Sequence, residues 1–162
     1  MLKQEGVSQQ ELDLVCLSSA ESGVNERRPG DELVGLTYSF IYAGTPSVIT
    51  SLWAINDLST LMLMETFYGG LAQGLSKSEA LQRAQLALMR LISDDIVKYI
   101  DARRSELEAR GELEHARLFW SSAYKSLLAT EQYKPIGQDL ASWHPFAHPA
   151  SWAPFILVGD WR

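Results

Sequence analysis

The chain has 162 residues, of which 46% are hydrophobic, and it carries a formal net charge of -6 at pH 7. The length predicts about one domain with a real core, the acidic balance argues against nucleic-acid binding, and no apolar stretch approaches the roughly 20 residues of a membrane-spanning helix. Residues 1–10 lack the apolar segment of a signal peptide and the single cysteine excludes an internal disulfide, so we expect a cytoplasmic domain.

The first predicted element is a short strand over 13–18. Its centre, Leu14-Val15-Cys16-Leu17, is apolar without alternation, which is typical of a strand covered on both faces, as in a parallel sheet. A loop of small residues follows it, Ser18-Ser19-Ala20-Glu21-Ser22-Gly23. Such a loop lies where α/β folds place ligands and catalytic groups. A nucleophile is expected near Ala20, whose methyl side chain supplies none.

The next segments alternate helix and strand. A helix is predicted over 32–43, with Gly44 as its C-cap. A nearly continuous apolar run predicts a buried strand over 47–53. The helix after it should cover 58–71, and Asp57 is in the position of its N-cap.

Three further helices are predicted before the chain returns to the sheet. The helix over 77–92 begins at a capping box formed by Ser76 and Glu79. The segment 93–132 has the composition of a charged helical hairpin inserted into the domain, with a break at Gly111. Its charged residues are typical of a solvated helical face (Arg103, Arg104, Glu106, Glu108 and Arg110).

The last predicted strand covers 155–158 and follows a loop over 133–152 that contains prolines and a glycine. Only three strands are thus predicted, whereas sheets usually have about 4 to 6 strands. Parallel strands also need neighbours and helices on both sides of the sheet. The sequence therefore predicts an α/β fold that contains only part of a mostly parallel sheet, with helices on both faces.

Several motifs occur together in the order of one known family. They are Leu14 to Gly23, Arg28 to Glu32, Phe40 to Gly44, Ser47 to Trp53 with Asp57, Ser76 to Leu81, and Trp152 to Trp161. In that order they resemble the C-terminal half of a CHAT domain, a caspase-like cysteine peptidase domain often found behind tetratricopeptide repeats. The resemblance covers nearly all of 1–162, apart from 93–132, and implies a three-layer α/β/α sandwich.

The resemblance implies hydrolysis of peptide bonds by a cysteine–histidine dyad. The family has Ser-Ala-Cys-Glu-Thr-Gly where this chain has 18–23, so the cysteine position falls on Ala20. The histidine belongs to an upstream half that would precede Met1. Because the thiolate attacks while the imidazole handles the proton, we expect this portion to be inactive alone. Expected partners are a protein or peptide segment, the missing N-terminal half, and a tetratricopeptide-repeat region.

The resemblance also implies a peptide groove, to which we assign Ser18, Ser19, Glu21, Gly23 and Asp57. Related peptidases hold a basic residue of the substrate in an acidic pocket, and Asp57 is our choice for that role. Its other interpretation is an ordinary helix N-cap, and the two roles are compatible. The loop serines are interpreted as partners of the backbone rather than nucleophiles, since no histidine of this chain is placed to activate them.

The remaining reactive side chains are assigned no chemistry. Cys16 is interpreted as an inert, small hydrophobic residue of its strand. His144 and His148 each precede a proline, which predicts a loop rather than a helical metal pair, so we expect neither a metal nor a cofactor. Two alternatives stay open: a non-catalytic peptide-binding module, or a flavodoxin-like domain whose 18–23 loop binds an anion. Glu21 at the centre of that loop argues against the anion.

Overall fold

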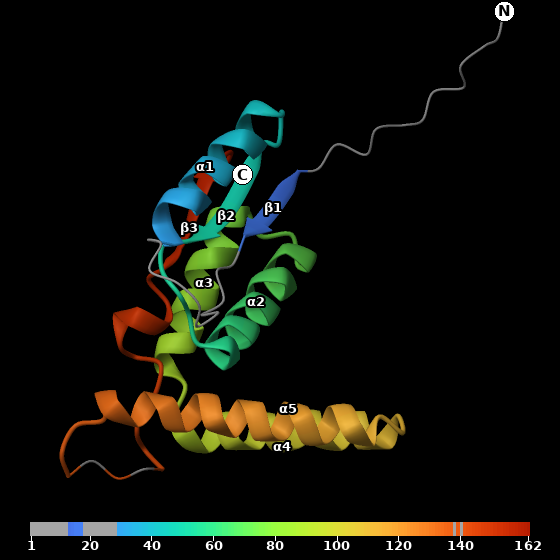
Figure 1. Ribbon diagram of the computed structural model, residues 1–162, viewed down its shortest axis with the longest axis vertical. Coiled ribbons are helices and arrows are strands. Elements are labelled where there is room, and N and C mark those ends of the chain that lie inside the picture. The colour runs from blue at the N-terminus through green and yellow to red at the C-terminus, as the bar shows by residue number, and fades with distance from the viewer. Residues whose placement is uncertain (1–12, 18–28, 138, 140) are drawn as a thin grey trace, which may run out of the picture.

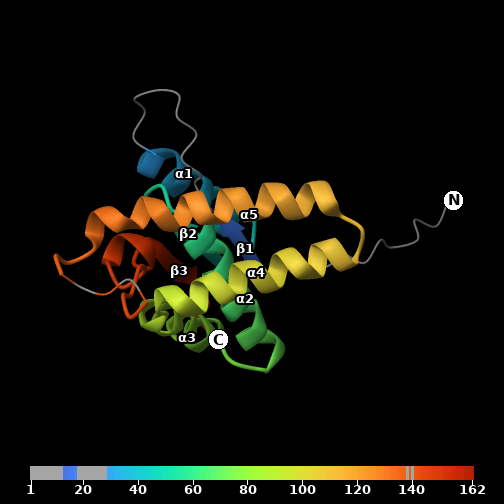
Figure 2. The same ribbon diagram turned by 90° about the horizontal axis from the view of Figure 1, so that it is seen from below.

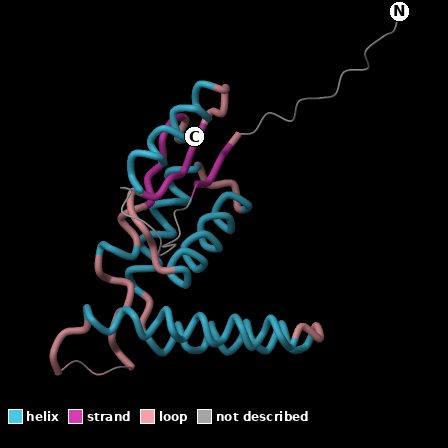
Figure 3. The backbone as a smooth tube through the Cα atoms, viewed as in Figure 1, coloured by secondary structure: helices cyan, strands magenta, loops and turns pink. Residues whose placement is uncertain are grey.

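The computed structural model describes residues 13–17, 29–137, 139 and 141–162 (Figure 1). In this part of the chain, five α-helices accompany a three-stranded sheet. The α/β class is therefore as predicted. The strands gather in one half of the molecule, and the other half is almost entirely helical (Figure 3). None of the described helices is long and apolar enough to cross a membrane.

The sheet is mixed, which corrects the prediction of a mostly parallel one. Its order is β1-β2-β3, with β1 at Leu14–Leu17, β2 at Ser47–Ser51 and β3 at Phe155–Gly159. β1 and β2 are parallel, but β3 runs antiparallel to β2. The chain returns at the carboxyl end of β2, where the Leu52 amide donates to the Pro154 carbonyl oxygen at 3.0 Å. A strand that enters there has to run back along β2.

Helices cover both faces of the sheet. α1, at Pro29–Tyr42, lies on one face, while α2 at Asp57–Ala72 and α3 at Lys77–Arg90 lie together on the other (Figure 2). The main core is on the α2–α3 face, where Phe67 of α2 and Ile49 of β2 are fully buried. The predicted alternation of strands and helices is thus confirmed, and so are the helices on both faces.

The helix boundaries follow local sequence signals. At the start of α3, the Ser76 hydroxyl accepts from the Glu79 amide, and the Glu79 carboxylate accepts from the Ser76 amide at 3.1 Å. This is the predicted capping box, which satisfies two amides that the helix leaves free. α1 ends just before Gly44, as predicted, although it begins three residues earlier than the pattern indicated.

The charged segment forms the predicted hairpin. α4, at Ser93–Ala109, and α5, at Leu113–Leu128, lie side by side across one end of the α/β unit (Figures 1 and 2). Arg103 does not simply face solvent as predicted, because its guanidinium bonds to Glu65 of α2. The Tyr99 hydroxyl donates to Glu65 at 2.8 Å, and burial together with this bond raises the pKa of Tyr99 to about 12.

A buried hydroxyl near the end of β2 leads to a first prediction. Thr50 is 3% exposed, and its Oγ1 has no hydrogen-bond partner within the described part of the chain. A buried polar group without a partner costs about 1–3 kcal/mol. Thr50→Val keeps the branched shape and removes the hydroxyl, so it should raise the free energy of unfolding by about 1 kcal/mol in urea titrations.

Thr130 provides the matched control. It is equally buried, at 3% exposed, but its hydroxyl donates to the Leu127 carbonyl oxygen at 2.6 Å. Thr130→Val should therefore lower the free energy of unfolding by about 1 kcal/mol, because it removes a satisfied hydrogen bond. Equal losses in both variants would contradict the assignment of Thr50 as an unsatisfied group.

Candidate functional site

The sequence predicts the site at the end of the sheet where the parallel strands β1 and β2 finish. Thr50 of β2 is opposite Leu17, so the two strands reach this end together. Of the predicted binding residues, only Asp57 is among those that the structure describes. The others, and the substituted cysteine position, lie outside the described residues (Ser18, Ser19, Ala20, Glu21 and Gly23).

Asp57 is not the N-cap of α2, which corrects the prediction. The cap is Asn56, whose side-chain oxygen accepts from the amides of Leu58 and Ser59 at 3.0 and 3.1 Å. Asp57 is instead the first helical residue, and its side chain is exposed. The two residue types are nearly equal as caps, so the sequence could not distinguish a cap at Asn56 from one at Asp57. The carboxylate of Asp57 is therefore available for a different role.

Asp57 lines a cavity of about 330 Å³ between the start of α2 and the end of α5. Ser122, Lys125 and Ser126 of α5 line the same cavity. The Asn56 side-chain amide donates to the Ser126 carbonyl oxygen at 2.7 Å, which holds the hairpin against α2. The volume is within the usual range for ligand sites, about 300–1,000 Å³. Sequence reasoning did not identify Ser122, Lys125 and Ser126 as site residues, because nothing in the segment 93–132 indicates where the hairpin packs.

A second, smaller cavity of about 100 Å³ shares Asp57, Ser122 and Ser126 with the first. It is apolar, and its walls include Leu61 of α2 and Phe119 of α5. Long basic side chains place their methylene groups on apolar surface while the charged head stays in a polar region. A carboxylate beside an apolar recess is thus chemically suited to a lysine or arginine side chain.

Cys16 has the environment of an inert thiol. Its Sγ accepts a hydrogen bond from the Tyr68 hydroxyl at 3.1 Å, and its side chain packs against the main core. Burial raises the pKa of Cys16 above its ordinary value, although the bond from Tyr68 acts in the opposite direction. Because the thiolate is the reactive form, this environment agrees with the interpretation of Cys16 as a small hydrophobic residue.

As predicted, the two histidines that are four residues apart do not lie on one helix. His144 and His148 lie in the irregular segment before β3, and His148 Nδ1 accepts from the Ala150 amide at 3.2 Å. Within the described ranges, no three histidine, cysteine, aspartate or glutamate side chains are grouped closely enough to hold a metal ion.

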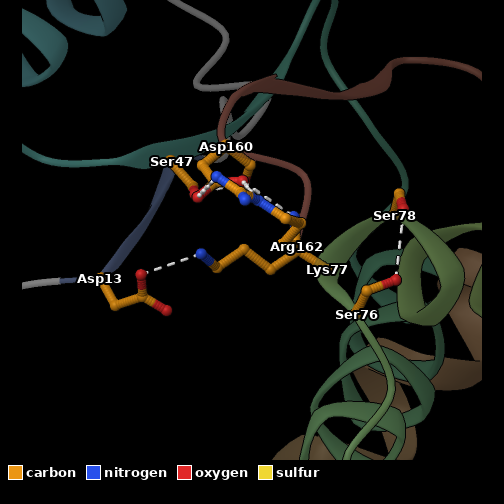
Figure 4. A network of polar contacts seen from close by, with 7 residues as sticks. All are labelled: Asp13, Ser47, Ser76, Lys77, Ser78, Asp160 and Arg162. Carbon is orange, nitrogen blue, oxygen red and sulfur yellow. Dashed lines mark hydrogen bonds and ion pairs between the residues drawn. The ribbon is translucent and has the colours of Figure 1, made fainter.

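Polar contacts connect the elements at the other end of the sheet, where β1 and β2 begin and β3 ends (Figure 4). Lys77 Nζ lies 2.9 Å from Asp13 Oδ1, and the Ser47 hydroxyl donates to the Asp160 carbonyl oxygen at 2.6 Å. The Asp160 carboxylate accepts from Arg162 Nε at 3.0 Å, and this bond lowers the pKa of Asp160. These contacts join the starts of β1, β2 and α3 to the end of β3, so this end of the sheet has a structural role.

Comparison with known proteins confirms the family resemblance found in the sequence. The family model described as "CHAT domain" matches residues 2–160, which is nearly the whole chain. Tetratricopeptide repeat protein 28 of mouse is 38% identical over 73 residues, and its human counterpart is 34% identical over 73 residues. Each match covers 45% of this chain but only 3% of the relative. No solved structure matches. The chain belongs to the CHAT domain family.

Proposed function

We propose that this chain is the C-terminal portion of a caspase-like CHAT domain that binds protein segments without cutting them. The observation that carries the proposal is the cavity between the start of α2 and the end of α5, where the exposed Asp57 carboxylate lies beside an apolar recess. We infer from the family resemblance that the ancestral activity was cysteine-type endopeptidase action on proteins. Ala20 in the cysteine position removes the nucleophile that such an activity requires.

The outer edge of β1 supports the proposal that the sheet continues beyond these three strands. Among the described residues β1 pairs only with β2, and all four of its side chains are half-buried. An edge strand of this kind offers unpaired backbone groups to another strand. We propose that an N-terminal half of the domain pairs there. The curated relatives are tetratricopeptide-repeat proteins of which the chain spans 3%, so a repeat region is a second proposed partner.

The bound segment should carry a basic residue. Asp57 is an exposed carboxylate at a cavity, and the described residues of the protein give it no ion pair. A lysine or arginine of the segment would place its charged head at Asp57 and its methylene groups in the apolar recess. In this role the Ser18, Ser19, Glu21 and Gly23 positions would border the peptide backbone.

Fluorescence anisotropy tests this function with labelled alanine peptides that contain one central arginine or one central glutamine. We expect the arginine peptide to bind more tightly, and Asp57→Asn to weaken its binding about two- to fivefold, as for an exposed ion pair. Mass spectrometry of the same samples should show uncut peptide.

Asp95→Asn is the matched control, because Asp95 is also an exposed aspartate in the first turn of a helix but lies on α4. It should leave the binding of the arginine peptide unchanged. Equal affinity of the protein for the arginine and glutamine peptides would rule out Asp57 as a basic-residue site. Absence of binding by both peptides would refute the proposed function.

A further inference from the structure

Two opposite charges from different parts of the chain line the cavity at the start of α2. Asp57 is contributed by α2, and Lys125 by the last turn of α5. Both side chains are exposed, and within the described residues they form no ion pair with each other. The cavity therefore presents a carboxylate and an ammonium group that do not neutralise each other by direct contact.

The position of Lys125 is fixed by the way the hairpin meets α2. The end of α5 faces the start of α2, where the Asn56 side chain donates to the Ser126 carbonyl oxygen at 2.7 Å. The negative end of one helix dipole thus meets the positive end of another, an arrangement that favours this packing. Ser126 is adjacent to Lys125 in sequence, so this bond anchors the backbone that carries the ammonium group.

The start of α2 itself is closed to an anionic ligand. The amides of Leu58 and Ser59, which would otherwise bind an anion, already donate to the Asn56 side chain. Lys125 is therefore the group in this cavity that can attract an acid, while Asp57 attracts a base. A segment that carries both charges fits such a pair better than a segment that carries either one alone.

We propose that Lys125 selects an acidic residue adjacent to the basic residue that Asp57 holds. This inference rests on the proposed function, because it names the class of segment that the same cavity takes: a peptide with neighbouring basic and acidic side chains. It also gives the α4–α5 hairpin a role, since this segment then forms the wall that distinguishes one peptide from another.

The test compares three fluorescein-labelled hexapeptides, each with two central residues between alanines: Arg-Glu, Arg-Gln and Arg-Lys. Anisotropy titrations of the whole chain should rank them in that order, with about two- to fivefold between neighbours, the size of an exposed ion pair. Lys125→Glu should reverse the order, and Lys125→Gln should make the three affinities nearly equal. High ionic strength should reduce the differences, because salt screens exposed charges.

Arg117→Glu is the control, since it makes the same change of charge on the same helix, at an arginine that is 76% exposed and does not line the cavity. It should leave the ranking unchanged. A ranking that Lys125→Glu does not alter, in a protein whose binding still depends on Asp57, would refute this inference and leave the proposed function standing. If none of the three peptides binds, both fall.

Discussion

Gly159→Ala should lower the free energy of unfolding by about 3–5 kcal/mol, which is in the range of severe core substitutions. Gly159 ends β3 with a φ of 100°, a conformation that residues with a side chain rarely adopt. A Cβ atom at this position would also lie far inside van der Waals contact with the Pro46 carbonyl oxygen. The variant therefore combines backbone strain with a clash against a neighbouring backbone.

The clash cannot be relieved without breaking hydrogen bonds. The Pro46 carbonyl oxygen accepts from the Asp160 amide at 2.8 Å, and the Ser47 hydroxyl donates to the Asp160 carbonyl oxygen at 2.6 Å. Moving β3 away from Pro46 would lengthen both bonds and disturb the pairing of Gly159 with Ser47. Urea titrations followed by tryptophan fluorescence would measure the loss of stability.

Gly44→Ala separates the strain from the clash. Gly44 has nearly the same φ, 98°, but a Cβ there would meet no atom within 4 Å. The expected loss of unfolding free energy is then only the cost of the left-handed backbone conformation, about 1–2 kcal/mol. Equal destabilisation by the two substitutions would show that the contact with Pro46 contributes nothing, and would contradict our account of Gly159.

The Gly-Asp-Trp sequence at the end of the chain is thus explained by structural contacts rather than by a catalytic role. Gly159 permits the close approach to Pro46, Asp160 bonds the start of β2, and the Trp161 carbonyl oxygen accepts from the Ser78 amide of α3 at 3.1 Å. None of the residues in these contacts lines the cavity. The terminal motif that supported the family resemblance in the sequence therefore stabilises the sheet without contributing to the site.

Local patterns predicted the elements well because their causes are local. The apolar run at 14–17, the capping box at Ser76 and the break at Gly111 all depend on neighbouring residues, and the structure confirms each of them. The direction of β3 depends instead on where a distant segment returns to the sheet, which no short pattern encodes. That is why the antiparallel pairing could not be predicted.

The same difference between local and long-range causes explains what could be predicted of the candidate site. The family resemblance selected Asp57, which follows a buried strand and is the first residue of a helix. It could not assign Lys125, since the packing of the hairpin on α2 depends on contacts between distant segments, such as those of Asn56 with Ser126 and Arg103 with Glu65. The composition of 93–132 predicted a hairpin but gave no indication of the surface that it covers.

The largest functional effect is expected at Ala20. The chain should hydrolyse peptides no faster than the uncatalysed reaction, because a methyl group can neither attack a carbonyl nor exchange a proton. Ala20→Cys alone should give little activity, since a thiol also needs a base to activate it. Ala20→Cys with the histidine-bearing N-terminal half of a CHAT domain supplied in trans should raise hydrolysis by about 10³-fold or more, the loss seen when such a unit is dismantled.

A fluorogenic arginine peptide and intact-protein mass spectrometry would follow this gain, and Cys16→Ser provides the control. Cys16 has a pKa raised by burial and bonds to Tyr68, so its removal should not change the rate of the Ala20→Cys variant. If the unmodified chain cleaves the peptide and Cys16→Ser abolishes that cleavage, Cys16 is a nucleophile and our binding proposal is wrong. If the complemented Ala20→Cys variant binds the peptide but does not cut it, the geometry around position 20 has diverged as well as its side chain.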